Sequence, residues 1–172
     1  MEKSKMQKSE TEKKFIEWII KIKFLKDQIF KLNKLKDFPI LSIALFLLKS
    51  QLIEWELKQL IIRMDLYLSF FHSSKILSIK VRTPREMSNE KWTFGRVVKE
   101  LDRYGGKFLQ TLKTECKKLV KLRNYFHHEL FRPGNINDLI KKADEGLEIT
   151  DRIIKEIEKV NTFLNQNDPL KK

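Results

Sequence analysis

The sequence has few of the residues that break helices, crosslink chains or bind metals. Its 172 residues include only 5 glycines and 4 prolines, a scarcity that favours long helices over many short strands joined by turns. The single cysteine, Cys116, excludes an internal disulfide, and we interpret it as a small core residue. With 3 histidines and one cysteine, the chain contains no group at zinc-like spacing. The sequence therefore predicts neither a metal site nor a cofactor.

Long apolar runs are also absent. The most apolar stretch, residues 38–48, covers about half of the roughly 20 residues that a membrane-spanning helix needs. The first residues, MEKSKMQKSETEKK, are polar and lack the apolar centre of a secretory signal. We therefore expect a cytoplasmic protein with no membrane partner, and a free cysteine fits that reducing compartment.

The sequence does contain a large positive charge, which lies in two separate segments. The formal net charge is +13, and 41% hydrophobic and 34% charged residues are typical of one globular domain. Residues 1–36 hold 11 lysines and 5 acids, and residues 96–132 hold 10 basic and 4 acidic residues, so each segment carries +6. Segregated positive charge attracts polyanions such as RNA. The alternative interpretation is a lysine-rich surface that is only solvated.

Apolar residues recur every three or four positions over most of the chain, the period of an amphipathic helix. The stretch 39–72 is apolar nearly all round, so we expect it in the centre of a bundle or covered by a partner subunit. Thr93 can cap a helix, while Gly105-Gly106 and Pro133-Gly134 mark helix ends. The expected helices span residues 12–36, 39–72, 94–104, 107–131 and 136–165.

These segments predict an all-α fold, an up-and-down bundle of about five helices with one long loop at about residues 73–92. We expect residues 1–12 to form a flexible tail and residues 13–168 to form a single helical-bundle domain. Phe70, Phe71 and His72 could stack on bases, although packing in the core or in an interface is the favoured interpretation.

The helix expected over residues 107–131 carries the residues most suggestive of chemistry. At 100° per residue, its apolar side chains form one stripe toward the core, with Arg123 and His127 at the edge of that stripe or inside it. The stripe consists of Leu109, Leu112, Cys116, Leu119, Phe126 and Leu130. An arginine there needs a partner, so Arg123 paired with a carboxylate of another helix is one interpretation, and a hydrogen-bonded structural role is one for His127. A different face could grip phosphates and move a proton, and it gathers Lys117, Lys121, Asn124, His128 and Arg132.

At these residues the sequence resembles a known family. The string Arg123-Asn124-x-x-x-His128 is similar to the Arg-x4–6-His motif of the HEPN superfamily (higher eukaryote and prokaryote nucleotide-binding domains), which many members write as Arg-Asn-x-x-x-His. The setting is also similar, because the motif lies near the end of a long helix that is followed by a turn and a last helix. The segment TFGRVVKEL at residues 93–101 resembles the helix opening that precedes the motif helix in several members.

The resemblance implies a metal-independent endoribonuclease, a toxin or host-defence effector that acts as a homodimer with a shared Arg/His cleft. His128 would be the general base or acid on the ribose 2′-hydroxyl or the leaving oxygen, a role that suits an imidazole because it titrates near neutral pH. Arg123 would hold the scissile phosphate with its forked guanidinium, and Asn124 would orient the ring or the phosphate. DNA, which lacks the 2′-hydroxyl, should not be cut. The residues expected to bind RNA are Lys117, Lys121 and Arg132.

His127 is the secondary candidate for the catalytic histidine. On an ideal helix Arg123 and His128 are about 140° apart, so their convergence needs the long arginine side chain, a local distortion or a second subunit. His127 shares the face of Arg123 better. Leu130 stands where one subgroup of HEPN toxins has a tyrosine, so we do not expect regulation by nucleotidylation of that tyrosine.

Two other functions stay open. One is a non-catalytic HEPN-like module that binds RNA, a nucleotide or a protein partner such as an antitoxin or regulatory protein. The other is an unrelated helical interaction protein, in which Arg123 and His127 are structural and the apolar helix 39–72 is the partner surface. The sequence contains no Gly-rich phosphate loop, no Ser–His–Asp order and no distinct pair of carboxylates, so other chemistries have little support.

Overall fold

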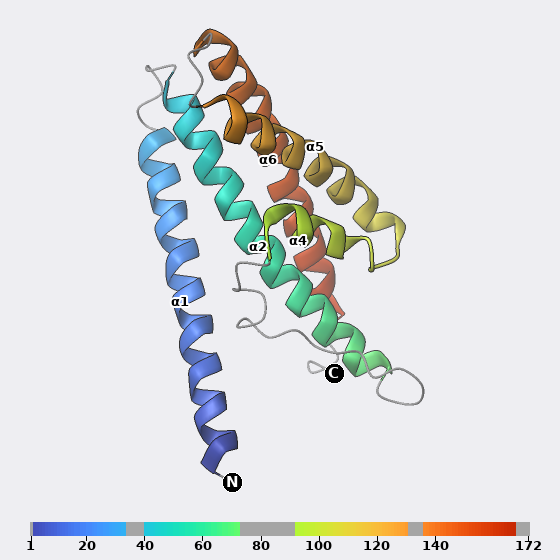
Figure 1. Cartoon of the computed structure of the whole chain (residues 1–172). Helices are drawn as coiled ribbons and strands as arrows, with labels where there is room; N and C mark the ends of the chain where they lie inside the picture. Colours follow the sequence, from blue (N-terminus) through green and yellow to red (C-terminus); the bar gives the residue numbers. More distant parts are fainter. Residues whose placement is uncertain (1, 34–39, 73–91, 131–135, 168–172) are drawn as a thin grey trace.

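The computed structural model describes residues 2–33, 40–72, 92–130 and 136–167. These residues form five α-helices and one short 3-10 helix, with no strand among them (Figure 1). The predicted all-α bundle is confirmed. The elements are α1 (Glu2–Asn33), α2 (Leu41–His72), α4 (Phe94–Leu101), η1 (Lys107–Leu109), α5 (Gln110–Glu129) and α6 (Ile136–Gln166).

The four long helices run alternately up and down, and the short α4 crosses beside α2 and α5 (Figure 1). Helix α2 packs against α1, α4, α5 and α6, so it occupies the centre of the bundle. Because neighbouring helices cover most faces of α2, apolar side chains are favoured on most of these faces. This position explains why the sequence of α2 is apolar nearly all round. Its fully covered side chains are Phe46, Ile53, Leu57, Leu60 and Ile61.

Helices α2 and α6 pack closely together at a glycine of α6. Gly146 of α6 lies directly over the ring of Phe46, and a Cβ atom added at Gly146 would overlap that ring. Phe46 in turn contacts Phe126 of α5, with ring centroids 4.8 Å apart. A glycine at this position therefore lets three helices share one aromatic contact.

Helix α1 packs against α2 through a smaller cluster that contains Ile22, Ile29 and Leu52. It begins at Glu2, so it includes residues 2–12, which the sequence predicts as a flexible tail. Lysine, glutamate and glutamine favour a helix over that stretch, and it contains no glycine or proline. No helix among the described residues is long and apolar enough to span a membrane.

The turn before α5 differs in one detail from the sequence expectation. Helix α4 ends at Leu101 rather than at Tyr104, and the Tyr104 hydroxyl donates a hydrogen bond to the buried Asp65 carboxylate at 2.5 Å. Gly106 then adopts a φ angle of +112°, a backbone conformation that is unfavourable for residues with a Cβ atom. The Pro133-Gly134 stop and nearly all of the loop expected at residues 73–92 lie outside the described residues.

Candidate functional site

Helix α5 positions the motif residues because its apolar stripe is anchored in the core. Five of the six stripe residues are buried, as the period predicts, whereas Leu130 is 36% exposed at the end of the helix. Burial raises the pKa of the Cys116 thiol, which keeps it protonated and makes it a packing residue. The buried stripe residues are Leu109, Leu112, Cys116, Leu119 and Phe126.

Two polar contacts hold α5 against α6. The Glu115 carboxylate pairs with Lys118 at 2.5 Å and with Arg152 of α6 at 2.9 Å. Burial raises the pKa of Glu115, but the hydrogen bonds and charges of Lys118 and Arg152 outweigh it, so the pKa lies below its usual value. Nearer the motif, the Tyr125 hydroxyl donates to Asp138 at 2.6 Å, and this hydrogen bond, with a smaller effect of burial, raises the pKa of Tyr125.

Arg123 is held between two other helices. Its Nη1 atom forms an ion pair with the Glu54 carboxylate of α2 at 2.9 Å, and its guanidinium carbon lies 4.7 Å from the ring centroid of Phe94 at the start of α4. This is the carboxylate partner from another helix that the sequence left open as one interpretation. Its side chain nevertheless remains 25% exposed, so the guanidinium is positioned and still accessible to a ligand.

The charge around Arg123 is not balanced. Glu54 also accepts a hydrogen bond from Lys58, one helical turn along α2, at 2.8 Å. Two cations therefore share one carboxylate, and the cluster carries a formal charge of +1. The side chain of Lys58 is only 9% exposed. Arg123 is therefore the cation of this cluster that an anion can contact from solvent.

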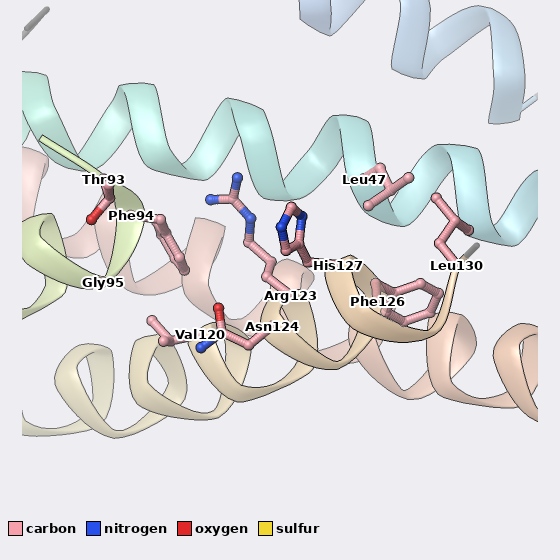
Figure 2. Close-up of a pocket in the computed structure, with 10 residues that line it drawn as sticks. All are labelled: Leu47, Thr93, Phe94, Gly95, Val120, Arg123, Asn124, Phe126, His127 and Leu130. Carbon is pink, nitrogen blue, oxygen red and sulfur yellow. The ribbon is translucent and has the colours of Figure 1, made fainter. Parts of the chain in front are cut away.

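The guanidinium lines a pocket of about 550 Å³ between α2, α4 and α5. Figure 2 shows Arg123 and His127 side by side on α5, with both side chains directed toward α2. We refer to this cavity as the Arg123 pocket. Its walls are formed by Leu47, Thr93, Phe94, Gly95, Val120, Arg123, Asn124, Phe126, His127 and Leu130.

The two candidate histidines lie in different places. His127 lines the Arg123 pocket, whereas His128 is not among the pocket residues. Both rings are exposed, and their centroids are 5.6 Å apart in an edge-on arrangement. No hydrogen bond to His127 is present within the described part of the chain, so the structural role left open for it has no support there. The structure therefore groups Arg123 with the secondary candidate, as ideal helix geometry favours.

The other predicted site residues divide between the pocket and the outer surface. Asn124 lines the pocket, but its side chain points away from the guanidinium, beside Val120 (Figure 2). Lys117 and Lys121 are exposed on the outer face of α5, and Lys117 pairs with Asp102 at 3.3 Å. Arg132 lies outside the described residues.

The start of α4 contributes backbone to the same pocket. Thr93 has the extended conformation of an N-cap residue, as the sequence predicts, but its side chain makes no capping hydrogen bond. Thr93 and Gly95 both line the pocket, so the amino end of α4 faces the same space as Arg123. The partial positive charge of a helix amino end adds to the field of the guanidinium there.

Two residues of this site were not identified from the sequence. Glu54 is a carboxylate inside a largely apolar helix, with Lys58 one turn later, and that pattern is the signal that could have singled it out. Phe94 carries no comparable signal, because an aromatic residue at the start of an amphipathic helix is ordinary core.

The structure shows no candidate metal site among the described residues, because no three side chains of His, Cys, Asp or Glu come together there as a possible ligand set.

Comparisons with known proteins do not place the chain in a family. No family model, curated protein or solved structure matches the chain.

Proposed function

We propose that the chain is a metal-independent endoribonuclease whose reaction takes place in the Arg123 pocket. The observation that supports this most is that Arg123, Asn124 and His127 line one pocket in which positive charge is in excess. A guanidinium and an imidazole can together bind a phosphodiester and move a proton. The likeness of residues 123–128 to the HEPN motif supplies the class of reaction.

In the proposed reaction, the neutral imidazole of His127 takes the proton from a ribose 2′-hydroxyl. The 2′-oxygen attacks the neighbouring phosphorus, the bond from phosphorus to the 5′-oxygen breaks, and a cyclic phosphate remains. Arg123 offsets the negative charge that develops on the phosphate oxygens. The leaving oxygen takes a proton from water or from protonated His128, whose ring adjoins that of His127.

The wider biological role in this proposal follows the family resemblance. The protein would be a cytoplasmic toxin or host-defence effector, controlled by an antitoxin or another regulatory protein. A homodimer would bring two Arg123 pockets to one RNA, with Lys117 and Lys121 as outer phosphate contacts.

The test is a cleavage assay with single-stranded RNA in EDTA, followed on a denaturing gel. His127→Ala should reduce cleavage at least about 100-fold, since general acid–base catalysis contributes that much, while the circular dichroism melt stays unchanged. His128→Ala is the matched control on the same helix turn and should lose only about tenfold, because water can replace it as the acid. Equal cleavage by the wild type and His127→Ala would refute the proposal.

A second candidate, a non-catalytic RNA-binding module, is favoured by two observations. Glu54 already occupies part of the hydrogen-bonding capacity of Arg123, and the motif histidine His128 lies off the pocket. Such a module would bind RNA through the excess charge without cutting it. Intact RNA after long incubation, with binding that weakens steeply as salt rises, would support this candidate instead.

A further inference from the structure

The Arg123 pocket has two chemically different ends. One end holds the charge of Arg123 and the backbone at the start of α4, beside Phe94 and Val120, whereas Leu47 of α2 and Leu130 form a wholly apolar end (Figure 2). His127 lies between the two ends. Because α5 rises about 1.5 Å per residue, Leu130 is displaced roughly 10 Å along the helix axis from Arg123. The pocket is therefore shaped for a ligand with a charged group at one end and an apolar surface at the other.

The two leucines expose apolar surface toward one cavity, Leu47 from α2 and Leu130 from the position that directly follows α5. Leu47 is 37% exposed and Leu130 is 36% exposed, while the ring of Phe126 beneath them is fully covered. A single exposed leucine is common, but a pair that lines the same pocket as an accessible cation offers an apolar wall for part of a ligand. A nucleotide has the matching chemistry, because its phosphate is anionic and its base has broad, weakly hydrated faces.

We infer that Leu47 and Leu130 form a base-binding subsite for the nucleobase next to the phosphate held by Arg123. This inference depends on the proposed function, since it assumes RNA as the ligand. The two side chains carry no hydrogen-bond donor or acceptor. They therefore contact the apolar face of a base and do not discriminate between bases by the donors and acceptors on the base edges. A base can lie there only when it is unstacked and unpaired, so the subsite selects single-stranded over duplex RNA at that position.

The experiment measures binding of a fluorescein-labelled 2′-fluoro oligouridine by anisotropy. A 2′-fluoro group cannot attack phosphorus, so the oligonucleotide stays intact during the measurement. A set of oligonucleotides carries one abasic residue at each position in turn. The proteins are the full-length wild type, the variants Leu47→Ser and Leu130→Ser, and the control Leu66→Ser. Leu66 is another exposed leucine of α2, and it does not line the Arg123 pocket.

One internal abasic position should weaken binding to the wild type by roughly five- to tenfold, as expected when about 50 Å² of apolar surface is no longer covered. Leu47→Ser and Leu130→Ser should weaken binding of the intact oligonucleotide by a similar factor and be insensitive to that abasic position. Leu66→Ser should behave as the wild type.

The outcomes separate this subsite from the proposed function. If the oligonucleotide binds with an affinity that depends on salt and on Arg123, but the abasic scan is flat, the base subsite is overturned and the phosphate pocket stands. If the leucine variants respond to the abasic residue as strongly as the wild type, the subsite is also overturned. If the oligonucleotide does not bind at all, both the subsite and the proposed function are overturned.

Discussion

Arg123 and Glu54 form an ion pair of 2.9 Å that joins α5 to α2 at the edge of the pocket. Glu54 is also bonded to Lys58, so one carboxylate compensates two cations of low exposure. The ion pair fixes the direction of the guanidinium, while the second cation keeps the charge of the cluster positive.

Glu54→Gln should lower the free energy of unfolding by about 2 kcal/mol, because Arg123 and Lys58 would lose their shared counter-charge in a poorly solvated place. Urea denaturation at neutral pH measures this. Glu56→Gln on the same helix is the control, since Glu56 pairs with the exposed Lys26 and should contribute less than about 1 kcal/mol. Equal losses in both variants would contradict the buried character of the Glu54 cluster.

Arg123→Lys should weaken binding of 2′-fluoro oligouridine by about tenfold, although the charge is kept. A lysine ammonium cannot reach Glu54 and a phosphate with separate nitrogens, as a forked guanidinium can. Fluorescence anisotropy at low salt measures the affinity. Arg63→Lys is a matched control on α2, where Arg63 bonds to Asn161 and Asn165 away from the pocket. An unchanged affinity in Arg123→Lys would exclude bidentate phosphate binding.

Glu115 should make the fold sensitive to acid. Its folded pKa lies below the usual value, so it stabilises the native state above its unfolded pKa and loses this contribution as the pH falls through the folded pKa. The stability gap between the wild type and Glu115→Gln should therefore be largest near pH 6 and shrink toward pH 3. Urea midpoints at several pH values measure the gap, and a gap that widened in acid would reverse the sign of this prediction.

Gly146→Ala should destabilise the fold by about 2 kcal/mol, because the new methyl group would overlap the ring of Phe46. Thermal unfolding measures the loss. The double variant Gly146→Ala with Phe46→Leu should lose less than the sum of the two single changes, since the smaller side chain makes room for the methyl group. Strict additivity would show that the two residues do not share this contact.

The all-α fold could be predicted from the sequence because apolar residues that recur every three or four positions over such long segments indicate helices. The central place of α2 follows from its largely apolar character, whereas α4 ends at Leu101, before the Gly105-Gly106 pair that marks its expected end. The prediction of a flexible tail over residues 1–12 differs from the structure, in which α1 begins at Glu2. There the helix propensity of lysine and glutamate competes with end fraying, and a polar pattern does not decide between them.

The site was only partly accessible from the sequence. Helix geometry already put His127 on the face of Arg123, whereas the family pattern pointed to His128. The Glu54 partner lies 69 residues away from Arg123, and a pairing at that separation depends on how α2 packs against α5. The exposure of Leu130 was missed because a helical period has no meaning beyond the last turn, where the chain leaves the core.

The most direct test of the Arg123 pocket as the RNA site is an NMR titration of the histidine ring signals with 2′-fluoro oligouridine. The chain has 3 histidines, His72, His127 and His128, so each ring can be assigned by single substitution. The expected result is that the His127 signals shift most and the adjacent His128 signals shift less. Binding that leaves the His127 signals unmoved would contradict the assignment of this pocket.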